Sequence, residues 1–368
     1  DFLEKNSNFG LKIDFVIESE PLGTAGALNL VQSLTEDFLL VYGDIIFDVH
    51  LEKFINFHKS KGGIGTLLVH PNDHPQDSDL VQLDGDSKIQ SFLMKNKVKK
   101  LYSNNVNSGL FILKRKILEY IPTKKIDLVN DIFPKVLLNR HRLYGYQSSE
   151  YVKDMGTPSR IREIEKSLNL GIPSVKNLHN YQKAVFIDRD GVVNKEVDNL
   201  IHMKDFELID GVLEAIELLN KSPFLAIIVT NQPAVAKGFC TIETINKINM
   251  KLETVLGDNG LKLEAIYFCP HHPEKGFKGE NKEYKIECSC RKPKIGLLEK
   301  ARKSFNIDYS QSFMIGDSTR DILAGKTAGV KTILVKTGYG GKDNTYSVEP
   351  DYVSRNLLEA VENIVIKN

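Results

Sequence analysis

Cysteine is scarce in this chain, and long apolar runs are missing from it. Only four of the 368 residues are cysteine, and three of these lie between positions 269 and 290. That crowding favours a metal site in a reducing compartment over a framework of disulfides. No run approaches the roughly 18 apolar residues of a membrane span, and the first ten residues lack the pattern of a signal peptide. We therefore expect a cytoplasmic protein with no membrane partner.

An excess of charge of either sign is also missing. The 49 Lys and Arg residues balance 48 Asp and Glu residues, so nucleic acid is not expected as the main partner. With 41% apolar and 26% charged residues, the composition is that of a soluble globular protein. A length of 368 residues exceeds one ordinary core and predicts two domains.

Apolar segments alternate with amphipathic ones in the first half, a pattern typical of an α/β fold with a mainly parallel sheet. Strands are predicted at residues 12–18, 38–44 and 63–70, and helices at 51–61, 127–140 and 159–170. The stretch 171–182 contains Gly, Pro, Ser and Asn without either periodicity and predicts a linker. We therefore expect domains at 1–170 and 183–368.

The second half continues the alternation with strands that are apolar throughout, which predicts a sheet buried on both faces. Three of these strands end in a polar residue, namely Asp188, Thr230 and Asp317. Ligands of open α/β sheets bind beyond the carboxyl ends of the strands. The three side chains are therefore expected at one site of a Rossmann-like domain.

Two aspartates one residue apart, Asp188 and Asp190, close the first of these strands in KAVFIDRDGVV. Alone, such a pair is more often a solvated turn. Here it follows a buried strand and precedes a glycine turn, and Mg²⁺ would neutralise the pair because this cation takes oxygen ligands. One carboxylate could then attack phosphorus, while the other protonates the leaving oxygen and later activates water.

Three further stretches add groups suited to phosphoryl transfer. Thr230 in IIVTNQ offers a hydroxyl to phosphate oxygens, and Lys292 in CRKPKIG offers a positive charge. Asp317 in MIGDSTRD is a further metal ligand at a strand end, with Asp321 one helical turn later.

In this order, the residues resemble the four signature motifs of the haloacid dehalogenase-like phosphatases over 183–345. The resemblance implies that Asp188 is the nucleophile and Asp190 the general acid and base. Thr230 and Lys292 are then phosphate stabilisers. The implied Mg²⁺ ligands are Asp188, Asp190 and Asp317.

A polar insertion contains the segments CPHHPE and CSC, separated by about 13 residues that have little apolar character. Cys269, Cys288 and Cys290 with His271 make the three-thiolate, one-imidazole set of a closed tetrahedral zinc site. His272 is the alternative imidazole, and an accidental grouping is the alternative to a metal site. We expect a structural Zn²⁺ that holds a loop with little core of its own.

This loop, together with TNQ, CRKP and FELIDGV, resembles the zinc-containing heptose-bisphosphate phosphatases and the related histidinol-phosphate phosphatases. The first family implies removal of the 7-phosphate of D-glycero-D-manno-heptose 1,7-bisphosphate through an aspartyl-phosphate intermediate, and the second remains the alternative. Substrate contacts are implied for Asn231, Gln232 and Arg291, although Arg291 could instead brace the zinc loop. Where the family reads TNQSG this chain reads TNQPA, and Pro233 has no N–H to offer.

The segment ESEPLGTAGAL is a glycine-punctuated loop that runs into a helix. Gly23 and Gly26 would let the backbone approach a ligand closely, although an ordinary turn is the alternative for the loop alone. LLVYGD, NSG and YVKDMGTP follow. This order resembles the sugar-1-phosphate nucleotidyltransferases of mannose and heptose type over about 12–170, and implies a truncated Rossmann-like sheet and a nucleoside triphosphate partner.

The loop of that family contacts the nucleotide base and sugar, which implies contacts for Glu20, Gly23 and Thr24. The aspartates that end GD and precede GTP hold Mg²⁺ against the phosphates, which implies this role for Asp44 and Asp154.

The sugar contacts of the family are matched only in part. Asn107 and Gly109 of NSG match one of them. Lys95 matches the Lys of the family's EKP stretch, in which Met94 here replaces an acidic sugar ligand.

The family opens with a G-G-x-G-T-R loop that cradles the triphosphate, and nothing like it occurs in this chain. We therefore expect the sequence to be a fragment whose transferase half is inactive. The two halves suit consecutive steps, in which the phosphatase releases heptose 1-phosphate and the transferase activates it, with GDP-heptose as the expected product. A first domain that senses a nucleotide or sugar without turnover is the alternative from another class.

Overall fold

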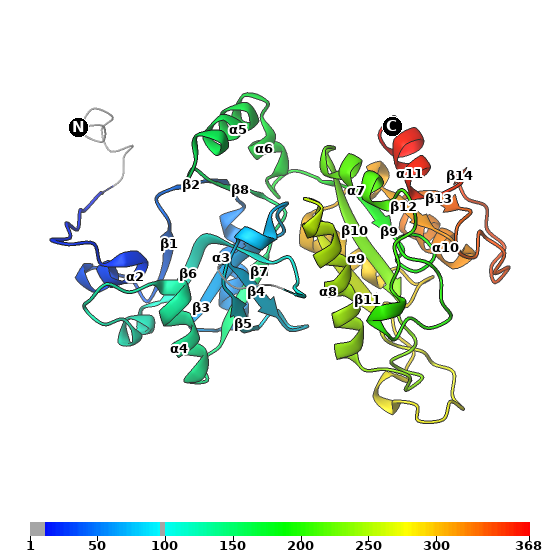
Figure 1. The fold of residues 1–368 in the computed structure, drawn as a ribbon, viewed down its shortest axis with the longest axis horizontal. Helices are drawn as coiled ribbons and strands as arrows, with labels where there is room; N and C mark the ends of the chain where they lie inside the picture. The colour runs from blue at the N-terminus through cyan, green and yellow to red at the C-terminus, as the bar shows by residue number, and fades with distance from the viewer. Residues whose placement is uncertain (1–11, 96–99) are drawn as a thin grey trace.

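Two six-stranded sheets, each with its own helices, lie side by side in the computed structural model, which describes residues 12–95 and 100–368 (Figure 1). The first sheet and its helices come from the first half of the chain, and the second sheet from the second half. We refer to them as the first and second domains. This arrangement confirms the expected two-domain α/β fold.

The second sheet is parallel throughout, in the order β11-β10-β9-β12-β13-β14. Its strands are β9 (Lys183–Ile187), β10 (Phe224–Asn231), β11 (Ala265–Cys269), β12 (Phe313–Gly316), β13 (Lys331–Val335) and β14 (Tyr352–Ser354). Alternate residues of a strand point to opposite faces. Val185 and Ile187 accordingly enter one core cluster, while Ala184 and Phe186 enter another.

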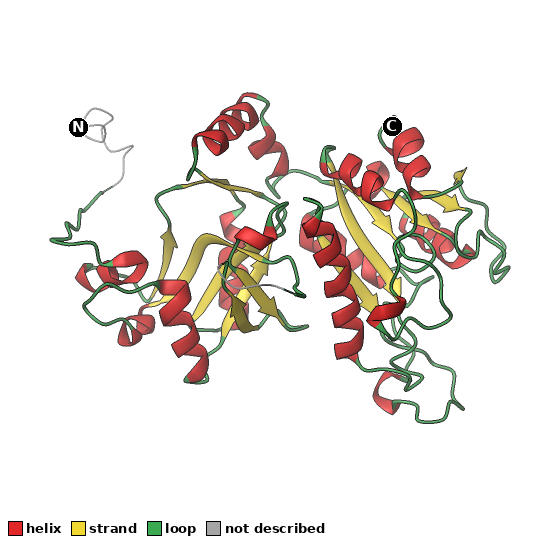
Figure 2. Ribbon diagram, in the orientation of Figure 1, coloured by secondary structure: helices red, strands yellow, loops and turns green. Residues whose placement is uncertain are grey.

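Helices cover both faces of this sheet (Figure 2), which explains why its strands are apolar without alternation. One core contains side chains of α7 (Val212–Asn220), α8 (Ile242–Asp258) and α11 (Leu357–Ala360), and the other contains those of α9 (Gly296–Phe305). α10 (Thr319–Ala328) packs on β12 and β13. The 3₁₀ and π helices of this domain are η6 (Met203–Asp205), η7 (Lys282–Tyr284), η8 (Tyr309–Gln311) and η9 (Val361–Val365).

The first sheet is mixed, which corrects the expectation of a mainly parallel sheet in this half. Its order is β5-β4-β6-β3-β7, with β1 also paired to β6, and only β3 and β7 are parallel neighbours. The strands are β1 (Asp37–Val41), β3 (Gly65–His70), β4 (Leu80–Leu83), β5 (Ile89–Leu93), β6 (Val106–Lys114) and β7 (Leu143–Gln147). A short turn joins β4 to β5, and antiparallel neighbours need no helical crossover.

A small antiparallel sheet of β2 (Ile45–Asp48) and β8 (Tyr151–Asp154) lies beside the first sheet. The helices of this domain are α2 (Gly23–Gly26), α3 (Leu51–Lys61), α4 (Phe133–Leu138), α5 (Pro158–Asn169) and α6 (Ile172–Lys176). The 3₁₀ and π helices of this domain are η2 (Ala27–Leu30), η3 (Pro75–Asp77), η4 (Arg115–Tyr120) and η5 (Leu128–Ile132). The predicted helix at 51–61 is therefore α3.

Residues 12–18, predicted as a strand, pair with no strand among the described residues, so that prediction was wrong. Phe15 and Ile17 are 74% and 90% exposed. A strand requires backbone hydrogen bonds from a neighbour, and an apolar sequence pattern does not supply that neighbour.

The segment 171–182, predicted to lack regular structure, contains the helix α6. It is also docked on the first domain, because the Asn177 side-chain amide donates to Asp48 and the Leu178 N–H donates to Glu150 Oε1 at 2.9 Å. The side chain of Leu178 in turn belongs to a core cluster of the second domain. This segment therefore fastens the two domains to each other.

The junction between the domains is formed chiefly along α8. The Tyr102 N–H donates to Thr254 Oγ1 and the Asn104 N–H to Glu253 Oε1, both at 3.1 Å. A Cβ atom on Gly257 would lie 2.5 Å from the Tyr102 hydroxyl oxygen. Glycine at position 257 is thus what allows the two domains to pack this closely.

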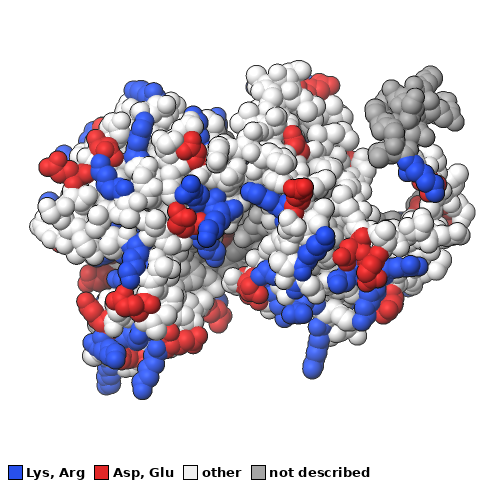
Figure 3. All heavy atoms as spheres, turned by 180° about the vertical axis from the view of Figure 1, so that it is seen from behind, with Lys and Arg blue, Asp and Glu red and all other residues white. Residues whose placement is uncertain are grey.

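Within the described part of the chain, no helix combines the length and apolar character needed to cross a membrane. On the face drawn in Figure 3, Lys and Arg side chains are interspersed with Asp and Glu over both domains, in agreement with the balanced composition.

Gly257→Ala should loosen the junction. The new methyl group would collide with Tyr102, and overpacking of this kind typically costs ~1–3 kcal/mol, which outweighs the ~0.5–1 kcal/mol that alanine adds to a helix. We expect faster amide hydrogen exchange at residues 102–104 and 253–258. Gly85→Ala is the matched control, because a Cβ there meets no atom within 4 Å. Equal exchange in the two variants would contradict a packed junction.

Candidate active sites and metal centre

Three carboxylates and one lysine meet at the carboxyl edge of the second sheet. Asp188 follows β9, Asp317 follows β12, and Asp321 lies in the first turn of α10. One oxygen of each carboxylate lies within 4.8 Å of the other two. The fully buried Lys292 pairs with Asp188 Oδ1 at 3.0 Å and with Asp321 Oδ1 at 2.6 Å. Residues far apart in the sequence are thus brought to one point.

The carboxylate of Asp190 lies outside this group of three. It accepts hydrogen bonds from the Arg189 guanidinium at 3.0–3.2 Å, from Asn194 Nδ2 at 2.9 Å and from Gln232 Nε2 at 2.7 Å. The side chain of Arg189 is itself buried and donates to Asn249 Oδ1 in α8 at 2.9 Å. The predicted Mg²⁺ ligands were Asp188, Asp190 and Asp317. The carboxylates that lie together in the structure are Asp188, Asp317 and Asp321.

The electrostatics of the group favour a bound cation. Burial raises the pKa of Asp188, and the charge of Asp321 adds to the rise. Burial followed by the charges of Asp188 and Asp321 raises the pKa of Asp317 to about 8. Burial opposes the charge of Lys292, but Asp188 and Asp321 outweigh it and raise the pKa of this amine. One lysine thus faces three carboxylates, and a divalent cation with oxygen ligands would relieve the remaining repulsion.

Two glycines allow the backbone to close around Asp317. Gly191 and Gly338 have positive φ, and a Cβ on either would lie 2.2 or 2.0 Å from Asp317 Oδ2. The same oxygen accepts a hydrogen bond from the Tyr339 N–H at 2.7 Å. The glycine after the two aspartates of the first motif is therefore required by the approach of this third carboxylate.

Thr230 and Asn231 end β10 beside these carboxylates, and Gln232 follows directly. Gln232 Nε2 donates to Thr230 Oγ1 at 3.0 Å as well as to Asp190, so it links the hydroxyl to the second aspartate. The Asn231 side chain makes two hydrogen bonds of 3.0 Å with the backbone N–H and C=O of Lys292. Asn231, expected to contact substrate, is here bound to the backbone of Lys292 and positions that residue.

A cavity of about 110 Å³ opens over these groups. The predicted residues that line it are Asp188, Asp190, Thr230, Asn231, Gln232, Arg291, Lys292 and Asp317. Arg291 Nη1 also donates to the His271 carbonyl oxygen at 3.4 Å. Arg291 therefore faces the cavity and contacts the cysteine-rich loop at the same time.

Three charged residues that no motif had singled out also line this cavity, namely Glu196, Asp198 and Arg320. Burial, followed by the charge of Arg320, lowers the pKa of Arg291. Burial, followed by the charges of Asp190 and Asp188, raises the pKa of Glu196 to about 7. Arg320 stands within MIGDSTRD, where its place directly before Asp321 could have indicated it, whereas no motif marks Glu196.

The polar insertion brings Cys269, His271, Cys288 and Cys290 together. The closest approaches among their sulfur atoms and His271 Nδ1 range from 3.1 to 3.6 Å, far longer than the ~2.05 Å of a disulfide. Four ligands around one zinc ion would lie roughly 3.5 to 3.8 Å apart. The donor set and its spacing therefore fit zinc. Of the two histidines, His271 belongs to the group, and the alternative His272 does not.

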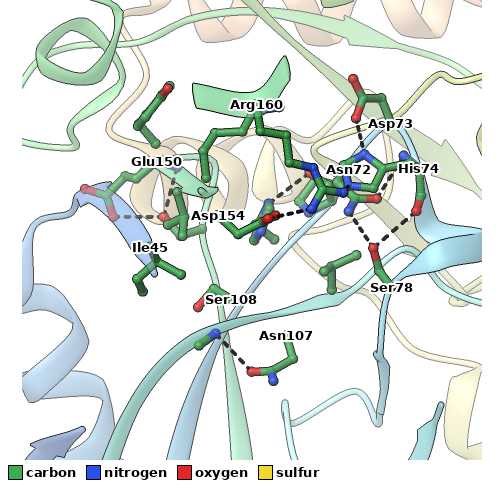
Figure 4. A pocket seen from close by; sticks show the side chains of 18 of the residues that line it. Ile45, Asn72, Asp73, His74, Ser78, Asn107, Ser108, Glu150, Asp154 and Arg160 are labelled. Atoms are coloured by element: carbon green, nitrogen blue, oxygen red, sulfur yellow. Dashed lines mark hydrogen bonds and ion pairs between the residues drawn. The ribbon is translucent and has the colours of Figure 1, made fainter. Parts of the chain in front are cut away.

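A cavity of about 540 Å³ lies beside β2 and β8 in the first domain (Figure 4). The predicted residues Asp44, Lys95, Asn107, Gly109 and Asp154 line it. The backbones of Asp44 and Asp154 lie close together, because Ile45 pairs with Asp154 and the Met155 N–H donates to the Asp44 carbonyl oxygen at 2.7 Å.

Arg160 and His74 also line this cavity near Asp154, and neither belongs to a motif recognised in the sequence. Figure 4 shows Arg160 directed at Asp154 and at His74. Burial would raise the pKa of Asp154, but hydrogen bonds from Arg160 and from the Gly156 N–H lower it overall. Asp154 is therefore held ionised beside the cavity.

Glu20, Gly23 and Thr24 do not line this cavity. Thr24 Oγ1 donates to Asp127 Oδ2 at 2.9 Å and accepts from the Leu128 N–H at 2.8 Å. A Cβ on Gly23 would lie 2.5 Å from the Ile126 carbonyl oxygen. The predicted nucleotide loop is thus packed against residues 126–128, and this contact accounts for the glycine.

Both halves of the chain are similar to known proteins. The Nucleotidyl transferase family model matches residues 1–169, and the HAD-hydrolase-like model matches residues 289–360. The D-glycero-beta-D-manno-heptose-1,7-bisphosphate 7-phosphatase of Pasteurella multocida is 43% identical over 158 residues, which are 43% of this chain and 83% of that protein. The protein of the same name from Haemophilus ducreyi is 42% identical over 159 residues, 43% of this chain and 85% of that protein. A crystal structure of D,D-heptose 1,7-bisphosphate phosphatase from B. bronchiseptica, complexed with magnesium and phosphate, is 29% identical with a TM-score of 0.45, and the match covers 51% of this chain and 100% of that one.

The chain is therefore an enzyme that joins a nucleotidyltransferase domain to a haloacid dehalogenase-like phosphatase domain. Through the part matched by these relatives, it belongs to the family of the D-glycero-beta-D-manno-heptose-1,7-bisphosphate 7-phosphatases. The combination of families expected from the motifs is confirmed.

Cys288→Ser should lower the zinc content of the purified protein, which we expect to be about one ion per chain in the wild type. It should also speed hydrogen exchange in residues 270–287, because a site that loses one thiolate holds the loop less firmly. Elemental analysis and hydrogen exchange measure the two effects. Cys240→Ser is the matched control, since Cys240 lies outside the metal-ligand group. Wild-type protein prepared without chelator and free of zinc would contradict the site.

Proposed function

We propose that the second domain is a Mg²⁺-dependent phosphatase that removes the 7-phosphate of D-glycero-D-manno-heptose 1,7-bisphosphate through an aspartyl-phosphate. The observation that supports this most directly is the carboxylate of Asp188 beside Lys292, with Asp317 and Asp321 within 4.8 Å and a cavity above them. The names of the relatives support the choice of substrate.

In the first step, a carboxylate oxygen of Asp188 attacks phosphorus and the bond from phosphorus to the sugar oxygen breaks. Asp190 gives a proton to the departing oxygen. Lys292 and the Thr230 hydroxyl stabilise the charge that develops on the phosphate oxygens. Gln232 supports this arrangement, because it bonds both Asp190 and Thr230 and so keeps the acid beside the phosphate-binding hydroxyl.

In the second step, Asp190 takes a proton from water, and the resulting oxygen attacks the phosphorus of the aspartyl-phosphate. The bond to Asp188 breaks, and inorganic phosphate leaves with the carboxylate restored. Asp188, Asp317 and Asp321 would hold Mg²⁺, whose charge offsets that of the phosphate oxygens. The Cys269, His271, Cys288 and Cys290 group would hold a structural Zn²⁺, because four protein ligands leave no open position.

We infer that the first domain is a heptose-1-phosphate nucleotidyltransferase domain, of guanylyl specificity, with its boundary within residues 171–182. The support is a cavity of about 540 Å³ that combines Asp44 and Asp154 with Lys95, Asn107 and Gly109. Two aspartates beside a cavity suit a metal ion between phosphates. Histidinol phosphate remains the second candidate substrate of the phosphatase, and the assay below separates the two.

Asp188→Asn should abolish release of phosphate from heptose 1,7-bisphosphate, because the amide cannot form the acyl phosphate. Loss of a covalent nucleophile lowers kcat by orders of magnitude. Asp205→Asn, on the exposed turn η6, is the matched control and should keep wild-type turnover. Turnover of the Asp188→Asn variant within about tenfold of wild type would remove Asp188 from the role of nucleophile.

Arg291→Ala should reduce the preference for the bisphosphate over histidinol phosphate by roughly ten- to a hundredfold in kcat/KM, the value of one charge-assisted contact with the second phosphate. Arg355→Ala, at an exposed position, is the control. A wild-type enzyme that hydrolyses histidinol phosphate faster would overturn the heptose assignment. An unchanged preference in Arg291→Ala would confine Arg291 to bracing the cysteine-rich loop.

A further inference from the structure

The cavity of the first domain continues to the junction with the second domain. There its wall comes from Lys153 in β8, Lys176 at the end of α6, and Asn220 and Lys262 of the second domain. On the face drawn in Figure 3, Lys and Arg side chains lie on both sides of the groove between the domains. Three lysines from three separate segments thus line one end of a single cavity.

Lys262 is built firmly into this wall. The side-chain amide of Asn220 donates to the Lys262 carbonyl oxygen and accepts from the Lys262 N–H, both at 2.9 Å. The Lys262 amine pairs with Glu264 Oε1 at 3.0 Å, while Glu264 Oε2 accepts from the Ala226 N–H at 2.9 Å. The amine also lies 3.5 Å from the Pro71 carbonyl oxygen in the first domain. Its position is therefore fixed from both domains.

Lys176 has no such counter-ion. In the part of the chain that the structure describes, no carboxylate forms an ion pair with it, and the charge of Lys262 followed by burial lowers the pKa of Lys176 to about 8. The carboxylates whose charge reaches it, Glu264 and Asp73, are already paired with Lys262 and His74. The positive charge at this end of the cavity is thus not fully neutralised by the protein.

We propose that this end of the cavity is a phosphate-binding subsite built by both domains, in which Lys176, Lys262 and Lys153 bind the phosphate group of a sugar phosphate. Lysine ammonium groups are effective point charges for phosphate oxygens, and a phosphate dianion supplies the counter-charge that Lys176 lacks. A cavity of about 540 Å³ accommodates a small phosphorylated sugar. The choice of a sugar phosphate rests on the proposed transferase function, whereas the phosphate subsite itself does not.

The subsite is separate from the phosphatase site. Asn220 ends α7 shortly before β10 begins, and Lys262 shortly precedes β11. Both residues therefore lie at the amino ends of strands of the second sheet, whereas Asp188 and Asp317 follow the carboxyl ends. Phosphate bound at the two sites will accordingly protect different peptides from hydrogen exchange.

The test is hydrogen exchange on the full chain with Mg²⁺, titrated with inorganic phosphate and with mannose 1-phosphate. Both are expected to protect residues 172–176 and 260–264, the sugar phosphate at lower concentration. Lys176→Met and Lys262→Met should each raise the concentration for half protection about tenfold or more, the value of one charged phosphate contact. Lys247→Met, which removes an exposed lysine of α8, is the matched control and should leave that concentration unchanged.

The absence of protection in both segments of the wild-type protein, or equal half-protection concentrations in all variants, would overturn the subsite. The wild-type measurement decides this even where a variant fails to fold. Protection by inorganic phosphate without protection by mannose 1-phosphate would overturn the sugar-phosphate assignment and count against the proposed transferase, yet leave the phosphate subsite in place. A third titration uses GTP. Protection of these segments at lower concentrations of GTP than of mannose 1-phosphate would also overturn the sugar-phosphate assignment.

Discussion

The buried ammonium group of Lys292 is the interaction on which the second domain's site depends. It bridges Asp188 at the end of β9 and Asp321 in α10, while Asn231 at the end of β10 binds the backbone of the same lysine. A charge taken out of water is tolerated only where partners are already in place, and removal of one partner from a buried pair typically costs ~3–5 kcal/mol. The fold of three separate segments and the geometry proposed for phosphoryl transfer are therefore stabilised by the same contacts.

Much of this site was predictable because it lies where a parallel sheet must put it. Unbroken apolar runs identified β9, β10 and β12, and the polar residue that ends each run had to fall at the carboxyl edge of the sheet. The crowding of Cys269, Cys288 and Cys290 with a histidine likewise indicated the metal-ligand group. The ion pair of Asp190 with Arg189 was not predictable. It depends on Asn249, which lies sixty positions away in α8 and binds the Arg189 guanidinium.

In the first domain, prediction from the sequence failed for a different reason. Local periodicity located α3 well, but it did not reveal that β3, β4 and β6 pair antiparallel, since pairing depends on which strands meet and not on the pattern within any one of them. The glycine-rich loop had the composition of a ligand loop, yet Gly23 is needed because the Ile126 carbonyl lies against it. A close backbone approach to another chain segment and a close approach to a ligand leave the same mark in a sequence.

The joining of the domains constrains how their two reactions can be related. The proposed phosphatase site opens at the carboxyl edge of the second sheet, while the cavity of the first domain is closed by Asn220 and Lys262 near the amino edge. A sugar phosphate that leaves the proposed phosphatase site would therefore have to reach the cavity of the first domain through solvent, so the fusion does not provide direct transfer. The second domain does provide the positive charge of Lys262 in the wall of that cavity. Glu264 pairs with this lysine, and close packing at Gly257 keeps the two domains together. The affinity of the first domain for a phosphorylated ligand should consequently depend on how firmly the two domains are docked.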